Sequence, residues 1–320
     1  LFLYRQVMDG RAQTGVVGCV HVDDYENDVI RKHEKTRRDK EDDRTRHVLE
    51  LNANAEPVFL TYRGRPEVDR LADRVMQSDP LYDFTAPDGV RHVVWRIADP
   101  RPWVDEFGLI PHAYVADGHH RSASAWRAGR ERRAAQENAH GNEEYNWFLA
   151  VLFPAEQLRI LPYNRVVRDL NGQSPADVLD ALRSIGTLVE TKAAAPEAPG
   201  SVGVFLASRW YRLAFDPASI DADDPIGSLD VSLLQDRVLT PVLGVGDPRT
   251  DPRIDFVGGI RGTAEIERRV RSGEMAIGFA MHPTTLEQLM AVSDAGLVMP
   301  PKSTWFEPKL RSGLFVHLLD

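Results

Sequence analysis

The sequence predicts an α+β protein with mixed sheets rather than a regular alternation of parallel strands and helices. Three observations support this class. Strand-like segments meet at Asp9-Gly10 and at Pro87-Asp88-Gly89, turn sequences that predict β-hairpins. Other segments carry the apolar spacing of amphipathic helices. The patterns GxGxxG and GxxxxGK[ST] are both missing, so neither a dinucleotide-binding fold nor a P-loop is predicted.

The N-terminal half begins with two strands within residues 1–22, followed by an almost entirely polar segment at 24–46. Residues 66–78 are predicted to be helical because their apolar side chains, Val68, Leu71, Val75 and Met76, recur at helical spacing. The other elements expected in this half are a strand at 57–63, the hairpin with second strand HVVWRI, the strand HAYVA, a helix at 121–138 and a strand at 145–153.

A change of composition near residues 190–200, ETKAAAPEAPG, predicts a domain boundary because the segment is rich in small residues and proline. We therefore expect one domain at 1–190 and a second α+β portion at 201–320, whose closing loop, 299–312, packs back on the functional site. The elements expected in the second portion are strands at 202–207, 209–215 and 275–280, helices at 228–242, 264–271 and 284–295, and a last strand at the C-terminus.

The bulk properties restrict the class of protein. The chain has 320 residues, of which 42% are hydrophobic and 27% charged, and its net charge of −9 makes a nucleic-acid partner an unfavourable prediction. No apolar run reaches the roughly 18–20 residues of a membrane span, and no signal peptide is recognisable. A single cysteine, Cys19, excludes an internal disulfide framework, so a cytoplasmic location is expected. The start at Leu1, without methionine and inside an apolar run, leads us to expect a missing N-terminal segment.

The segment AYVADGHHRS concentrates polar chemistry at a predicted strand-to-helix turn. Asp117 ends the strand, Gly118 permits a tight turn, and the free N–H groups of a helix start attract anions. Arg121 adds a planar fork suited to phosphate, while His119 and His120 are hydrogen-bond donors or proton-transfer groups. The structural alternative is that Asp117 is an N-cap and the histidines are partly exposed first-turn residues. Zinc is not predicted, because adjacent helical side chains diverge by about 100° and HExxH is absent.

Two further segments carry candidate groups. In RKHEKTRRDKEDDR, His33-Glu34 is a possible acid/base pair and Arg44 a possible phosphate contact, although a solvated helix with i,i+4 ion pairs explains this composition better. In KSTWFEPK, the groups that suit phosphate are Lys302, Ser303 and Lys309. A packed connection before the final strand explains that segment equally well. A surface loop likewise explains Asn164 and Arg165 in YNRVVRDL about as well as a functional role does.

Four blocks in order, IRKHEKTRRDKEDDR, ADGHHR, LRILPYNRVVRDL and MPPKSTWFEPKLRSGL, resemble the bacterial "domain of unknown function one-thousand-and-fifteen" family over essentially the whole chain. Around the DGHHR box this family is similar to free serine kinases of the ParB/sulfiredoxin-like superfamily. The second resemblance rests mainly on Asp117–Arg121, with Glu34 as the match to an upstream glutamate. The usual family box has an aromatic residue where Ser122 stands here.

The resemblance implies a ParB/sulfiredoxin-like core and a small-molecule phosphotransferase that uses ATP or ADP with Mg²⁺ to form O-phosphoserine or a similar product. Glu34 would activate the acceptor hydroxyl, and Asp117 would hold Mg²⁺ or orient the attacking group. His119, His120, Gly118 and the remaining cationic and hydroxyl candidates named above would stabilise phosphate; these are Arg121, Arg44, Lys302, Ser303 and Lys309. Two alternatives stay open: a ParB-like nucleotide-binding regulatory or DNA-associated module without phosphotransfer, and an inactive scaffold in which Asp117, His119 and Glu34 lie far apart.

Overall fold

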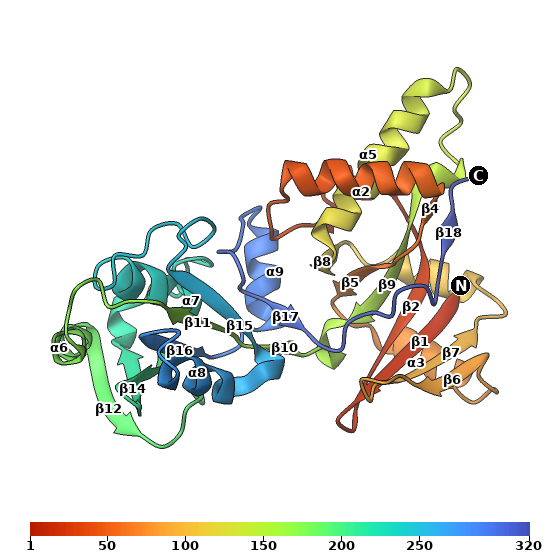
Figure 1. Cartoon of the computed structure of the whole chain (residues 1–320). Helices are drawn as coiled ribbons and strands as arrows, with labels where there is room; N and C mark the ends of the chain where they lie inside the picture. The colour runs from red at the N-terminus through yellow and green to blue at the C-terminus, as the bar shows by residue number, and fades with distance from the viewer. The chain divides into compact units, whose positions relative to one another are not determined.

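The protein was analysed as a computed structural model that describes residues 1–320. It divides into two compact units, Leu1–Arg159 with Phe306–Asp320, and Ile160–Trp305 (Figure 1). Each unit combines a large sheet with helices, which confirms the predicted α+β class. No helix has both the length and the apolar character that crossing a bilayer requires.

The first unit is built on an eight-stranded mixed sheet with the order β3-β8-β5-β9-β2-β1-β7-β6. β3 pairs with β8 and β5 with β9 in parallel, whereas the other neighbours are antiparallel. The strand bounds are β1 Phe2–Met8, β2 Arg11–His21, β3 Ile30–Arg31, β5 Val58–Tyr62, β6 Tyr82–Thr85, β7 Arg91–Arg96, β8 Ala113–Asp117 and β9 Trp147–Pro154. A separate small pair joins β4 Ala53–Asn54 to β18 His317–Leu318 near the C-terminus.

The predicted hairpin at the N-terminus is confirmed. Asp9 and Gly10 adopt φ values of 53° and 77°, the left-handed pair that a two-residue hairpin turn requires, and β1 pairs with β2 from Phe2 with Val17 to Met8 with Arg11. The register places Leu3 and Tyr4 in the core with no exposed surface.

Helices cover this sheet through two apolar clusters. One cluster joins α1 and α5 to β5, β8 and β9 through residues such as Val22, Ala123, Val115 and Phe148. The other joins α3 and α4 to β1, β2, β5 and β7 around Trp103. The helix bounds are α1 Val22–Glu26, α2 Arg38–Leu51, α3 Pro66–Val75, α4 Arg101–Phe107 and α5 His119–Ala135, with short 3₁₀ turns η1 Glu144–Asn146 and η2 Ala155–Gln157.

The second unit contains a six-stranded antiparallel sheet with the order β12-β14-β13-β16-β11-β15. Its core includes Val166, Phe205 and Ile266. The strands are β11 Tyr163–Val167, β12 Gly186–Thr191, β13 Ser201–Leu206, β14 Arg209–Phe215, β15 Ile254–Gly258 and β16 Ile277–Met281, after the two-residue β10 Ile160–Leu161. The helices are α6 Pro175–Ile185, α7 Asp230–Leu234, the π-helical η4 Gln235–Leu239, α8 Gly262–Arg271 and α9 Leu286–Asp294, with 3₁₀ turns η3 Pro217–Ser219 and η5 Gly259–Arg261. The chain leaves this unit at β17 Trp305–Phe306.

The compact units divide the chain at positions other than the expected boundary at 190–200. β12 and β13 flank that Pro-rich segment, and both pair with β14. The segment is therefore a connection within one sheet, because the strands on either side of it share a neighbour. Two further predictions need correction. The helix expected at 121–138 begins at His119, and the helix expected at 228–242 is the short α7 followed by the π-helical turn η4.

Candidate active site at the start of helix α5

The turn between β8 and α5 is formed by Gly118, which is the N-cap residue of α5 with φ 101°. A Cβ at this position would lie 2.9 Å from Nε of Arg121, so glycine permits both the left-handed backbone and the close approach of the guanidinium. Ser122 donates its backbone N–H to the Gly118 carbonyl at 2.9 Å, which closes the first helical turn. The N–H groups of the preceding residues have no partner within the helix, and the positive end of the helix dipole lies with them.

Asp117, the last residue of β8, forms an ion pair with Lys309, whose Nζ donates to Oδ2 at 2.7 Å. Burial alone would raise the pKa of the Asp117 carboxyl, but Lys309, Arg121 and the Gly118 backbone N–H together lower it. Asp117 is therefore an ionised carboxylate at neutral pH. The contact joins residues 192 positions apart and brings this part of the C-terminal segment to the DGHHR turn.

Arg121 is held by Glu56, with Nη1 donating to Oε2 at 3.0 Å. The other carboxylate oxygen of Glu56 accepts a hydrogen bond from the Ser312 hydroxyl at 2.8 Å. Burial opposes ionisation of Glu56, but Ser312, Arg121 and Arg44 outweigh it and lower the pKa of the carboxyl. Arg44 is exposed on α2, and its charge acts on this cluster. The predicted phosphate contacts Arg121, Arg44 and Lys309 thus belong to one network that also includes two acidic residues.

Glu34 and His119 lie together although they are far apart in sequence. His119 Nδ1 is 3.7 Å from Glu34 Oε2, and only 5% of the His119 side chain is exposed against 52% for Glu34. Burial, followed by the charge of His120, lowers the pKa of His119 to about 3. The imidazole is therefore neutral, and the contact is one between a carboxylate and a neutral ring rather than a true ion pair.

His33 packs against His119. The sequence suggested it only as a possible acid/base partner of Glu34 and not as a site residue. The two rings meet edge to face with centroids 4.4 Å apart. Burial lowers the pKa of His33 well below its ordinary value. Both ring nitrogens of His33, and Nε2 of His119, are buried without a hydrogen-bond partner. His33 could have been inferred from the sequence because it is adjacent to Glu34. A residue next to the candidate base lies near the same site.

His120 has a different position from His119. Its Nε2 accepts a hydrogen bond from the backbone N–H of Arg37 at 3.1 Å, and Arg37 is the N-cap residue of α2. Burial, then the charge of Arg44, lowers the pKa of His120, so the ring is the neutral acceptor that this bond needs. The contact fixes the segment that carries Glu34 to the first turn of α5.

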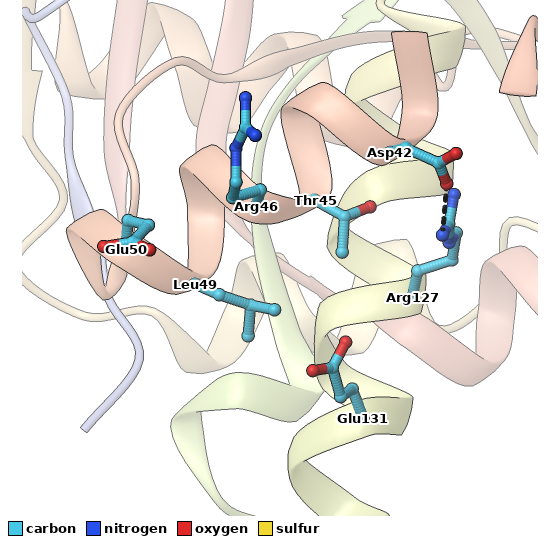
Figure 2. A pocket seen from close by; sticks show the side chains of 7 residues that line it. All are labelled: Asp42, Thr45, Arg46, Leu49, Glu50, Arg127 and Glu131. Carbon is cyan, nitrogen blue, oxygen red and sulfur yellow. Dashed lines mark hydrogen bonds and ion pairs between the residues drawn. The ribbon is translucent and has the colours of Figure 1, made fainter. Parts of the chain in front are cut away.

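The packing of α2 on α5 supports the same arrangement (Figure 2). Ser124 Oγ donates to the Glu41 carbonyl at 3.3 Å, and Arg127 Nη2 donates to Asp42 Oδ1 at 2.6 Å. A shallow groove lies between the two helices, lined by Asp42, Thr45, Arg46, Leu49, Glu50, Arg127 and Glu131. None of the predicted site residues lines it, so this groove is not the candidate site.

Lys302 and Ser303 belong to the second unit. The Lys302 ammonium lies over the Tyr163 ring, 5.6 Å from its centroid, and Ser303 Oγ donates to the Pro300 carbonyl at 2.6 Å. Their predicted role in phosphate binding stays a prediction.

The expected Mg²⁺ finds two carboxylates among the predicted site residues near the turn: Asp117, which already accepts from Lys309, and Glu34, which lies beside His119. No group of three potential metal ligands occurs in the structure. Mg²⁺ is commonly held by one or two carboxylates together with substrate phosphates. The residues therefore do not form a resident metal site, and Mg²⁺ would have to enter with a nucleotide.

The fold and the site define an α+β protein with a charged strand-to-helix turn. Residues 1–232 match the family model described as "Protein of unknown function (DUF1015)", and the chain belongs to this family. A comparison with curated proteins found no significant match.

Solved structures similar to the chain include SbnI with a C-terminal truncation from Staphylococcus aureus, with 12% identity, coverage of 94% of this chain and 87% of that one, and a TM-score of 0.47. A free serine kinase in complex with AMP has 11% identity, coverage of 91% and 86%, and a TM-score of 0.42. A conserved hypothetical protein from Pyrococcus furiosus has 12% identity, coverage of 93% for both chains, and a TM-score of 0.42. The sequence identities and TM-scores are low, so these similarities carry no information about the activity of this chain.

Proposed function

We propose that the protein is a phosphotransferase that moves a phosphoryl group from ATP or ADP to the hydroxyl group of a small acceptor. The observation that carries the proposal is the approach of Glu34 to within 3.7 Å of His119 at the start of α5. This places a carboxylate suited to general-base catalysis beside a helix N-terminus suited to phosphate. The inactive-scaffold alternative predicted instead that these two residues would lie far apart.

In the proposed reaction, the acceptor oxygen attacks the terminal phosphorus of the nucleotide while its proton passes to the Glu34 carboxylate. A new oxygen–phosphorus bond forms, and the bond from phosphorus to the bridging oxygen breaks. The nucleotide leaves with one phosphate fewer, and Glu34 later returns the proton to water. His119, which is neutral and buried, positions the Glu34 carboxylate without supplying a counter-charge.

Charge on the transferring phosphoryl group would be stabilised by the first N–H groups of α5, by Arg121 and by Lys309. Both cations are held beside the turn by carboxylates, Glu56 and Asp117, before any phosphate arrives. When a phosphate binds, Arg121 and Lys309 would each replace a carboxylate partner by a phosphate oxygen. The two side chains would need to move little. Mg²⁺, when it accompanies the nucleotide, would neutralise phosphate charge.

The acceptor and the product of the proposed reaction are inferred from the resemblance of the DGHHR box to free serine kinases. On that basis free L-serine is the acceptor we propose to test first, with O-phosphoserine as the product. The net charge of −9 disfavours a nucleic-acid acceptor.

The test is an assay of the full chain with ATP or ADP, Mg²⁺ and a panel of amino acids that contains L-serine, with products followed by ³¹P NMR. Glu34→Gln should reduce turnover by about 100-fold or more while nucleotide binding is retained, because general-base catalysis contributes roughly that much. Glu50→Gln is the matched control, since Glu50 is an exposed carboxylate on α2; it should behave like the wild-type chain.

The outcomes separate the alternatives. Nucleotide binding without transfer to any acceptor would support the ParB-like regulatory module instead. Neither binding nor transfer would support the inactive scaffold. Equal turnover by wild type and Glu34→Gln would exclude the proposed base even if a phosphorylated product forms.

A further inference from the structure

Arg165 carries a positive charge inside the second unit. It lies on β11, where it faces Phe256 of β15 and Phe279 of β16, and only 4% of the residue is exposed. The surface-loop alternative for Asn164 and Arg165 is therefore wrong, because both residues lie in a buried strand. The neighbouring Asn164 is equally buried and accepts the backbone N–H of Met281 through its side-chain oxygen at 3.0 Å.

The partners of the Arg165 guanidinium are carbonyl groups and an aromatic ring. Nη2 donates to the Lys302 carbonyl at 3.0 Å, Nη1 donates to the Tyr163 carbonyl, and the group lies 5.6 Å from the centroid of Phe256. No carboxylate forms an ion pair with it. Burial lowers the pKa of Arg165 to about 10, which still leaves it charged at neutral pH.

An arginine in such a place is unusual, because a buried charge is normally paired with an opposite charge. The five N–H donors of a guanidinium also exceed the two hydrogen bonds that the carbonyls accept. Both facts predict that an anion completes the environment of Arg165.

A cavity of about 180 Å³ adjoins this guanidinium. Its walls are largely apolar and include Ile226, Val231 and Phe256 together with three prolines, Pro248, Pro300 and Pro301. The polar groups that line it besides Arg165 are Ser232, Gln235 and Asp236.

Ser232 supplies an independent indication of a ligand. The residue is only 5% exposed, it lines the cavity, and its hydroxyl is buried without a hydrogen-bond partner. A hydroxyl in this situation normally finds a partner, and an anion in the cavity would provide an acceptor. Asp236, the one acidic lining residue, is exposed, and the pKa shift of Arg165 has burial and Tyr163 as its causes rather than Asp236.

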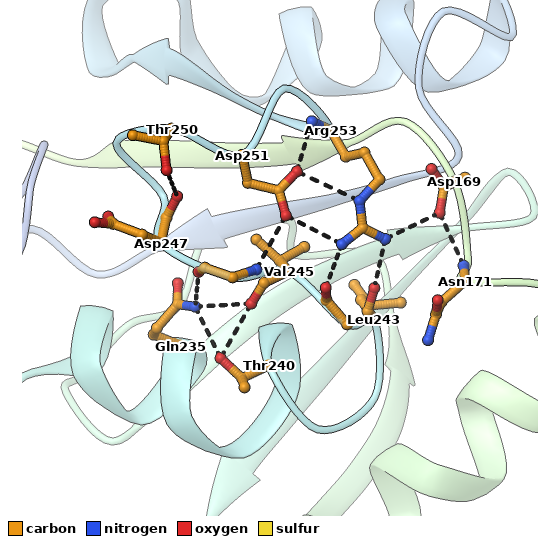
Figure 3. A network of polar contacts seen from close by, with 12 residues as sticks. Asp169, Asn171, Gln235, Thr240, Leu243, Val245, Asp247, Thr250, Asp251 and Arg253 are labelled. Carbon is orange, nitrogen blue, oxygen red and sulfur yellow. Dashed lines mark hydrogen bonds and ion pairs between the residues drawn. The ribbon is translucent and has the colours of Figure 1, made fainter.

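The loop that carries Pro248 is held by a polar network (Figure 3). Arg253 binds Asp251 at 3.0 Å and the Leu243 carbonyl at 3.0 Å, and Gln235 Nε2 lies 3.1 Å from the Gly246 carbonyl. Gln235 also begins the π-helical turn η4, a feature often found at functional sites. These contacts hold the loop that forms one side of the cavity.

We propose that this cavity binds a small organic monocarboxylate, with the carboxylate on Arg165 and Ser232 and the apolar part against the prolines. A single carboxylate neutralises the one buried positive charge, whereas a phosphate dianion would add an uncompensated negative charge. The apolar walls favour an organic acid over an inorganic ion, and the volume limits it to a few carbon atoms. This binding does not depend on phosphotransfer by the first unit.

The experiment uses the full chain and sodium propionate as the probe, with sodium phosphate and sodium chloride at equal ionic strength as comparisons. We expect propionate to raise the melting temperature in a saturable manner, and calorimetry to give a dissociation constant. Ser232→Ala should weaken propionate binding about 3- to 10-fold, the effect of one hydrogen bond. It should not lower the melting temperature without ligand, because it removes an unpartnered hydroxyl.

Ser184→Ala, at an exposed serine of α6, is the matched control and should bind propionate like the wild-type chain. Arg165→Lys, which keeps the charge but loses the guanidinium fork, should weaken propionate binding; if that variant fails to fold, Ser232→Ala carries the test. The proposal is overturned if propionate binding is not saturable, if phosphate stabilises the protein as well as propionate does, or if Ser232→Ala binds like wild type.

Discussion

The turn at Gly118 and the cavity at Arg165 handle positive charge in opposite ways. At the turn, Lys309 and Arg121 each have a carboxylate partner, Asp117 and Glu56, in a partly exposed setting. Arg165 is buried beside the cavity, and its guanidinium contacts two carbonyl oxygens and an aromatic ring.

This difference bears on what each region can bind. At the turn an incoming anion must compete with the resident carboxylates, so we expect moderate affinity and reversible exchange there. At the cavity no carboxylate forms an ion pair with Arg165, but the site offers one unit of positive charge in a confined, largely apolar space. The first arrangement suits a substrate phosphate, and the second suits a small ligand with one negative charge.

The largest expected effect is the loss of turnover in Asp117→Ala, which tests the proposed role of the turn. Loss of this carboxylate releases Lys309 and removes the group proposed to orient the reactants, so turnover should fall by about 100- to 1,000-fold, as for other preorganised electrostatic groups. The free energy of unfolding should change by less than about 1 kcal/mol because the ion pair is partly exposed. Steady-state kinetics and denaturant unfolding measure the two effects.

Asp43→Ala, at an exposed residue of α2 that pairs with Arg46, is the control for that variant. Turnover within about threefold of wild type for Asp117→Ala would remove Asp117 from the proposed mechanism.

The next effect concerns the buried imidazoles beside Glu34. The pKa of His119 is about 3 in the folded protein and about 6.5 in the unfolded chain, and that of His33 is also strongly lowered. Between these values the unfolded state binds more protons, so stability is full above about pH 6.5 and decreases as the pH falls. The expected slope is about 1.4 kcal/mol per pH unit for each histidine.

His33→Leu tests this slope. Both nitrogens of His33 lack partners, so the variant should unfold at pH 7 with a free energy close to that of wild type. Between pH 6 and pH 4 its stability should decrease less steeply. Parallel curves for the two proteins would mean that His33 is protonated in the folded state.

A smaller effect is expected at the turn itself. Gly118→Ala must adopt φ 101° and place a Cβ 2.9 Å from Nε of Arg121, whereas Gly10→Ala meets only the strain of φ 77° with no atom within 4 Å. We expect about 1 kcal/mol of destabilisation for Gly10→Ala and about 2–3 kcal/mol for Gly118→Ala, where strain and displacement of Arg121 add. Denaturant unfolding measures both, and equal costs would contradict the close approach of Arg121.

Much of the fold was predictable because its signals are local. Asp9-Gly10 specifies a hairpin turn, and Pro66 with four regularly spaced apolar residues specifies α3. Helix α6 also has a local signal, although it was not predicted. Ser174 and Asp177 form its capping box, and Pro175 lies in its first turn. α4, β12 and β15 were also not predicted.

Long-range partners were the part that sequence reasoning could not supply. No strand was predicted at β11, because its pairing strands, β15 and β16, lie about 90 residues or more further along the chain. At the candidate site the sequence predicted Lys309, Asp117 and Arg121 but not Glu56, and the pairing of Lys309 with Asp117 and of Arg121 with Glu56 depends on the fold. The same holds for the edge-to-face contact of His33 with His119.

The smallest expected effect concerns the ion pair between Lys309 and Asp117 as a contribution to stability. Both side chains are partly exposed, 47% for Lys309 and 36% for Asp117, so solvent and salt screen the attraction. Lys309→Met should lower the free energy of unfolding by no more than about 1 kcal/mol at low ionic strength, and the difference should shrink towards zero in 1 M salt. Turnover should fall more than stability, because Lys309 is one of the groups that we propose to bind phosphate. A loss of more than about 2 kcal/mol in the free energy of unfolding that persists in high salt would contradict this interpretation. It would show that the Lys309–Asp117 pair stabilises the fold and that Lys309 is not readily available to an incoming anion.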